Sequence, residues 1–194
     1  MAGNSRMQYS LLMVSSSEQF NILTKKALPS GLFNVIETRK SASGAKREVL
    51  ERNYDIIIIN APLMDEMGTD FVLGLQDKIN AGILMITPAE ISGNVTEMLI
   101  DYGVIVLAKP LKASAVNQAV RMLVANQKKL KDAEKRAKKA EEKLTELKLI
   151  NRAKLLLIQS GMNEEEAEKY IIKEAMDRGL KKKTVAVEII EDHN

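Results

Sequence analysis

The chain has 194 residues, a formal net charge of +3 and an apolar content of 45%, enough for one domain with a small appendage. No apolar run reaches the roughly 20 residues that span a bilayer and no secretory signal begins the sequence, so we expect a cytoplasmic protein without membrane contact. Cysteine is absent and the one histidine, His193, lies near the end. This excludes thiol catalysis and argues against histidine chemistry and zinc.

The first 110 residues alternate short aliphatic segments with segments of helical periodicity. Strands are predicted at 9–14 (YSLLMV), 33–38, 55–59 (DIIII), 81–87 and 104–108. Most of these segments lack polar alternation, which is typical of parallel strands buried on both faces. The five βα units predict an α/β fold with a doubly wound, five-stranded parallel sheet of the flavodoxin-like type.

Polar side chains follow four of the predicted strands. Because doubly wound sheets bind their ligands beyond the carboxyl ends of the strands, these residues mark a candidate site. They are Ser15 and Ser16 after the first strand, Asn60 after the third, Thr87 after the fourth and Lys109 after the fifth.

A long helix is predicted next, because the sequence from Lys112 to about Gln159 contains neither Gly nor Pro. Heptad spacing over residues 112–148 predicts a coiled coil, with an asparagine in the seam as a device that fixes register. Two interpretations are open: a parallel homodimer, which we favour, and a single long helix lying on its own domain. The predicted seam includes Val116, Leu123, Asn126, Leu130, Leu144 and Leu147.

Residues 149–192 have the pattern of a small three-helix domain. Gly161 suits the position after a helix C-terminus. Asn163, followed three residues later by Glu166, matches a capping box. Gly179 ends the second of the three helices. The apolar side chains expected to form the core are Leu156, Ile171, Met176 and Ile189.

Residues 8–122 resemble the receiver domain of bacterial response regulators, the output partners of two-component systems. The resemblance rests on Thr87 and on the AKP motif at 108–110. It implies an acidic pair after the first strand and a phospho-acceptor aspartate after the third, where this chain has Ser15, Ser16 and Asn60. The switch aromatic of the family is replaced by Val106.

These replacements remove the chemistry that phosphorylation needs. Receivers hold Mg²⁺ with carboxylates, and the metal neutralises the charge of the transferred phosphoryl group. An amide is a poor nucleophile, so we expect neither phosphorylation at Asn60 nor Mg²⁺ at this site. The degenerate site is therefore interpreted as a structural relic, with a pocket for a small anion attracted to Lys109 as the alternative.

The C-terminal segment resembles an ANTAR domain, a three-helix module that binds RNA in transcription antiterminators. The matching segments are Ala153-Lys154, Gly161, Glu166-Ala167, Ala175-Met176-Asp177 and Val185-Ala186. The order of receiver, coiled coil and ANTAR domain recurs in that family, so the two resemblances together cover almost the whole chain.

Exposed basic side chains and one tyrosine are the candidate RNA contacts. Cations supply salt-dependent contacts to phosphates, and aromatic rings stack on unpaired bases. Glu168 stands where the family commonly has an exposed aromatic residue, and Ile172 where it has an arginine; Tyr170 is either a substitute stacking residue or part of the core. The candidates are Arg152, Lys154, Lys169, Tyr170, Lys173, Arg178, Lys181, Lys182 and Lys183.

The resemblances imply an RNA-binding transcription antitermination regulator rather than an enzyme, with no catalytic residue, metal or cofactor. As a homodimer it would bind hairpin loops of nascent transcripts, without control by aspartate phosphorylation. The alternative is a regulator that acts through a regulatory protein partner and whose RNA binding has decayed. DNA binding is a weaker third hypothesis, because the C-terminal segment lacks a clear recognition helix.

Overall fold

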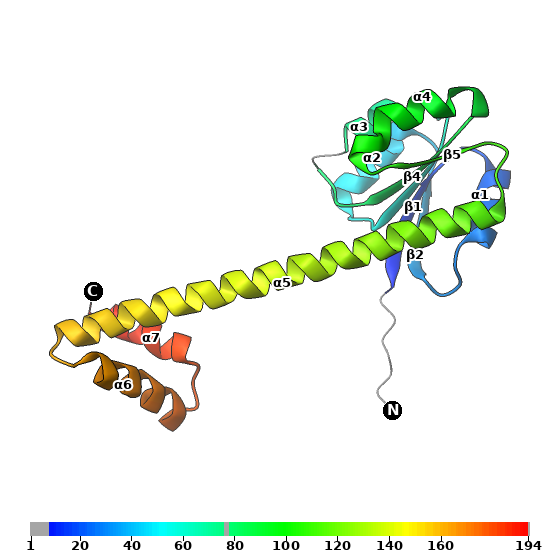
Figure 1. Cartoon of the computed structure of the whole chain (residues 1–194). Helices are drawn as coiled ribbons and strands as arrows, with labels where there is room; N and C mark the ends of the chain where they lie inside the picture. The colour runs from blue at the N-terminus through cyan, green and yellow to red at the C-terminus, as the bar shows by residue number, and fades with distance from the viewer. Residues whose placement is uncertain (1–7, 76–77, 194) are drawn as a thin grey trace. The chain divides into compact units, whose positions relative to one another are not determined.

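Five parallel strands form a single sheet in the order β2-β1-β3-β4-β5 (Figure 1). They are β1 (Tyr9–Val14), β2 (Phe33–Arg39), β3 (Ile56–Asn60), β4 (Gly82–Thr87) and β5 (Ile105–Ala108). The computed structural model describes residues 8–75 and 78–193. The predicted doubly wound α/β fold is confirmed, and the order is the one typical of flavodoxin-like sheets.

Helices cover both faces of this sheet (Figure 1). Helices α2 (Ala42–Glu51), α3 (Thr69–Leu73) and α4 (Ala89–Leu99) pack on one face, and α4 is followed by a short 3₁₀ helix, Ile100–Tyr102. Helix α1 (Glu18–Ala27) and the first turns of α5 (Ala113–Gln159) pack on the other face.

The central strands are aliphatic throughout because both of their faces are buried. In β3, Ile57 and Ile59 face the core under α2, α3 and α4. Their neighbours Ile56 and Ile58 face the core under α1 and α5. All four isoleucines are fully buried, and the one polar residue of β3, Asn60, stands at the end of the strand, where the candidate site lies.

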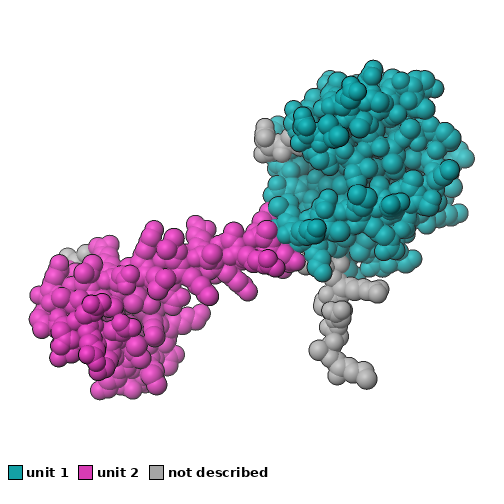
Figure 2. Space-filling model, viewed as in Figure 1, with its two compact units in different colours: residues 1–130 teal, residues 131–194 magenta. Residues whose placement is uncertain are grey.

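The chain divides into two compact units, residues 1–130 and 131–194 (Figure 2). In the first unit, α5 contributes Val116 and Leu123 to the core that also contains Leu11 and Ile58. Val116 is only 2% exposed and Leu123 only 3%. Their assignment to an intermolecular seam is therefore corrected, because their apolar surface is already buried against the sheet of the same chain.

The second unit contains residues 131–159 of α5, followed by α6 (Glu164–Asp177) and α7 (Lys182–Asp192) (Figure 1). The predicted capping box is present: the Asn163 side chain accepts from the Glu166 backbone N–H, and the Glu166 carboxylate accepts from the Asn163 N–H, both at 2.9 Å. Gly161 has a φ of 106°, as its predicted position requires. None of the helices in the described part of the chain combines the length and apolar character needed to cross a bilayer.

Small side chains let these three helices approach closely. Ala153, Ala167 and Ala186 are fully buried, and larger residues such as Ile171 and Ile189 fill the space around them. The prediction that Met176 belongs to this core is wrong, because Met176 is 76% exposed. The adjacent Ala175 takes the inward position on α6 instead.

Candidate functional site

The structure places the predicted strand-end residues at one edge of the sheet. Ser15 and Thr87 are fully buried and Asn60 is 9% exposed. The Asn60 amide nitrogen donates to the Ser15 hydroxyl at 3.1 Å. Ser16, by contrast, is exposed, so only one of the two serines takes part in this buried network.

Lys109 joins the group through backbone contacts. Its ammonium donates to the Ala61 carbonyl at 2.7 Å, and its N–H donates to the Thr87 carbonyl at 2.9 Å. The ammonium thus contacts the residue after Asn60 rather than the Asn60 side chain. Partial burial lowers the pKa of Lys109.

The carboxylates that follow the third strand in the sequence accept hydrogen bonds from backbone N–H groups. Asp65 accepts from the N–H groups of Ser43 at 2.9 Å and Ala42 at 2.8 Å, and these bonds lower its pKa. Glu66 accepts from the Phe71 N–H at 2.7 Å. Within residues 8–75 and 78–193, no three His, Cys, Asp or Glu side chains gather closely enough to hold a metal ion.

Two buried acceptors at this edge are unsatisfied. The amide oxygen of Asn60 and the hydroxyl oxygen of Thr87 have no hydrogen-bond partner among the described residues. A buried polar atom without a partner costs about 1–3 kcal/mol. The edge therefore retains polar groups that a further donor would stabilise.

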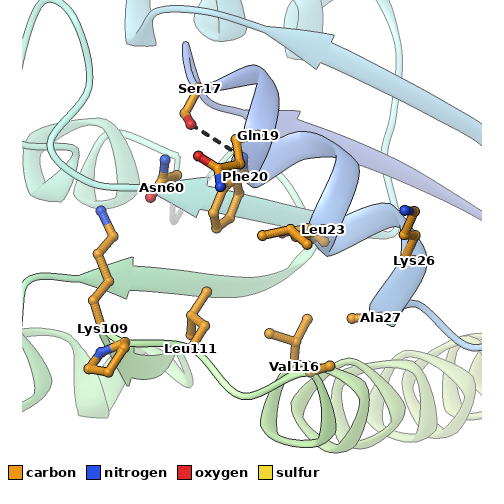
Figure 3. Close-up of a pocket in the computed structure, with 13 residues that line it drawn as sticks. Ser17, Gln19, Phe20, Leu23, Lys26, Ala27, Asn60, Lys109, Leu111 and Val116 are labelled. Atoms are coloured by element: carbon orange, nitrogen blue, oxygen red, sulfur yellow. Dashed lines mark hydrogen bonds between the residues drawn. The ribbon is translucent and has the colours of Figure 1, made fainter.

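A cavity of about 510 Å³ adjoins these residues (Figure 3). Asn60 and Lys109 line one end of it, and apolar side chains from α1 and from the start of α5 line its walls. The sequence analysis offered a small-anion pocket at Lys109 as its alternative but did not predict the apolar walls. The available signal for these walls was the apolar pair Phe20 and Leu23 on α1.

The later seam residues lie on the surface of the chain. Leu130 is 40%, Leu144 53% and Leu147 56% exposed, and Asn126 is also exposed. These four residues remain available for contact with a second copy, and the coiled coil through them stays a prediction.

Three of the predicted RNA-contacting cations are engaged with carboxylates. Lys154 on α5 lies 3.1 Å from Glu168 and 3.5 Å from Glu164, both on α6. The hydrogen bond to Glu168 raises the pKa of Lys154. Elsewhere in the unit, Lys169 lies 2.5 Å from Glu165, and Arg178 contacts both oxygens of Glu188 at 2.6 and 3.0 Å.

The other predicted cations are exposed and have no ion-pair partner in the part of the chain that the structure describes. Three of them gather where α7 begins, with Lys181 as its N-cap residue. Tyr170 is 40% exposed, which excludes it from the core. These unpaired cations are Arg152, Lys173, Lys181, Lys182 and Lys183.

The first unit has the fold of a response-regulator receiver domain. It is similar to the receiver domain of an HD domain-containing protein from Pseudomonas fluorescens Pf-5, with a TM-score of 0.58 and 18% identity over 68% of this chain and 97% of that one. It is also similar to a chemotaxis response regulator of Vibrio cholerae, with a TM-score of 0.52 and 18% identity over 60% of this chain and 99% of that one. These likenesses show the fold of the first unit.

The C-terminal residues identify the family more closely. Residues 138–190 match the ANTAR domain. The chain is 30% identical over 139 residues to the transcriptional regulatory protein PdtaR of Mycobacterium tuberculosis (strain CDC 1551 / Oshkosh), covering 71% of this chain and 67% of that protein. The chain belongs to the family of receiver-type transcriptional regulators with a C-terminal ANTAR domain.

Proposed function

We propose that the protein is an RNA-binding transcription antitermination regulator that recognises hairpin loops of nascent transcripts. The observation that carries this proposal is the ANTAR match over residues 138–190, together with the unpaired lysines at the start of α7. By stabilising paired hairpins, the protein would prevent a competing terminator from forming. This function makes and breaks no covalent bond.

The start of α7 is suited to phosphate groups for two reasons. Lys181, Lys182 and Lys183 are exposed there and carry positive charge. The N-terminus of a helix also offers free N–H groups and the positive end of the helix dipole. Tyr170 on α6 presents an exposed ring that can stack on an unpaired base.

A dimer would multiply two modest hairpin affinities through effective concentration. The exposed leucines of α5, Leu130, Leu144 and Leu147, supply the apolar contact for it. Alanine-rich segments of the helix between them allow two backbones to approach closely. We therefore propose a parallel coiled-coil homodimer that presents two RNA-binding units.

We further propose that aspartate phosphorylation does not control the protein, because Asn60 has no carboxylate and Ser15 supplies no metal-binding charge. Changing Asn60→Asp alone is expected to leave the protein unphosphorylated by a small phosphodonor. The measurement is mass spectrometry of the full chain after incubation with acetyl phosphate and Mg²⁺. A stoichiometric gain of one phosphoryl group on this variant would contradict the expectation, and the wild-type chain is the control.

Glu168 is expected to weaken RNA binding. Its carboxylate neutralises Lys154 at 3.1 Å and adds negative charge near the phosphates. The variant Glu168→Gln should therefore bind a two-hairpin RNA about three- to tenfold more tightly at low salt. Glu191→Gln makes the same charge change on the exposed surface of α7 and is the matched control. Equal affinities of the two variants in a filter-binding assay would contradict this role.

The ion pairs of Lys154, Lys169 and Arg178 favour a second candidate function, a regulator that acts through a protein partner. Three cations already held by carboxylates leave less positive charge for RNA. Filter binding with a two-hairpin RNA separates the two functions, since only the antiterminator requires salt-sensitive binding. Competition of equal strength by duplex DNA would instead indicate a DNA-binding output.

A further inference from the structure

The cavity beside the degenerate acceptor site has the features of a small-molecule site. Its volume of about 510 Å³ lies within the usual range for such sites, which are mostly apolar with a few polar groups at defined positions. In Figure 3, Phe20 and Leu23 of α1 point across the cavity toward Leu111 and Val116. These four side chains form an apolar wall on both sides.

Two polar side chains, Asn60 and Lys109, lie near each other at one end of the cavity in Figure 3, and Ser17 and Gln19 also line the cavity. Asn60 is nine-tenths buried, and its amide nitrogen is held by Ser15. Its amide oxygen has no hydrogen-bond partner among the described residues. This end of the cavity therefore has an acceptor that requires a donor.

Lys109 supplies the charge at the same end. Its ammonium carries three hydrogens, and the one contact recorded for it is the Ala61 carbonyl at 2.7 Å. No carboxylate within residues 8–75 or 78–193 forms an ion pair with it. A partly buried ammonium beside an apolar wall attracts an anion more strongly than one in water.

We propose that this cavity binds a small amphipathic carboxylate that carries a hydroxyl group next to the carboxylate. The carboxylate accepts from Lys109, and the hydroxyl donates to the Asn60 amide oxygen. A ring or branched chain of the ligand packs between Phe20 and Leu23 on one side and Leu111 and Val116 on the other. This binding is independent of RNA recognition by the C-terminal unit.

Other ligand classes fit these groups less well. A purely apolar molecule would leave Lys109 and Asn60 without partners. A phosphate monoester carries nearly two charges and usually requires several donors, whereas this end of the cavity offers one cation. The second lysine that lines the cavity, Lys26, lies at the opposite end in Figure 3.

Calorimetric titration of the full chain with three probes tests the chemistry. The probes are phenyllactate, phenylpropionate, which lacks the hydroxyl, and lactate, which lacks the ring. Phenyllactate is expected to bind, and each of the other two to bind about tenfold more weakly or not at all. No heat of binding from phenyllactate at millimolar concentrations, or equal affinity for phenyllactate and phenylpropionate, would overturn the proposal.

Variants locate the binding. Lys109→Met keeps the aliphatic stem without the charge and is expected to lose at least about tenfold in phenyllactate affinity. Lys25→Met, on the exposed face of α1, is the matched control and should bind as the wild type does. Ala113→Glu places a carboxylate that repels the ligand at the exposed rim of the cavity, outside the core. This variant tests the site if Lys109→Met does not fold. Retained affinity in Lys109→Met, or in Ala113→Glu, would contradict the site.

Discussion

Replacing Lys181, Lys182 and Lys183 by glutamine is expected to lower the affinity for a two-hairpin RNA about 100-fold at low salt. The three side chains are exposed at the start of α7, where the helix dipole adds to their charge. Each lost phosphate contact also reduces the slope of log affinity against log salt by about 0.7, so the triple variant should lose roughly two units of slope. Filter binding at several salt concentrations measures both quantities.

A destabilised α7 would not explain the expected loss of RNA affinity. Glutamine is a good helix former, and fewer cations at a helix N-terminus favour the helix. A second triple variant controls for net charge. Lys25, Lys40 and Lys112 are exposed lysines of the first unit, and their replacement by glutamine removes the same charge far along the sequence from the ANTAR match. Equal losses from the two triple variants would show that total charge, not the start of α7, determines RNA affinity.

Leu144→Asp is expected to convert the proposed dimer into a monomer and to lower two-hairpin RNA affinity about 100-fold through loss of avidity. Leu144 is 53% exposed in the single chain, so the change removes no core packing within one protomer. In a parallel coiled coil, however, the substitution places two carboxylates against each other in an apolar seam. Analytical ultracentrifugation reports the mass, and filter binding reports the affinity.

The neighbouring Thr145→Asp variant is the control for this experiment. It makes the same change of charge on the same turn, and Thr145 is exposed and outside the predicted seam. This variant should remain dimeric and retain its RNA affinity. A monomeric wild-type chain with full affinity, or a dimeric Leu144→Asp variant, would contradict the coiled coil.

The parallel sheet was predictable because strands that are buried on both faces are aliphatic throughout. The run Ile56–Ile59 needs no polar alternation when neighbouring side chains enter two different cores. The helix ends of the second unit were also predictable from local sequence. The side chains of Asn163 and Glu166 each accept a hydrogen bond from the backbone N–H of the other residue, within one turn.

The errors concern apolar helix residues, because the spacing of such residues does not determine which surface they pack against. A stripe with spacings of three and four residues fits a coiled-coil seam and also the face of a helix that packs on its own sheet. Val116 and Leu123 take the second role and Leu144 remains exposed, although all three obey one heptad. On α6, Met176 and Ala175 are neighbours in the sequence and face different sides of the helix. The sequence pattern did not determine which of the two side chains faces the core.

Contacts between elements were beyond the sequence analysis. Lys154 and Glu168 lie on different helices, and their contact depends on how α5 and α6 are rotated against each other. The cavity likewise depends on the separation of α1 from the start of α5. The identities of Asn60 and Lys109 indicated a degenerate site, while the unsatisfied oxygen of Asn60 required the structure.

The affinity of the full chain for a two-hairpin RNA, measured as a function of salt and protein concentration, tests the proposed function most directly. The account predicts binding that weakens steeply as salt rises and that depends on protein concentration as a dimer equilibrium requires. The absence of salt-sensitive binding, even at low salt, would contradict it.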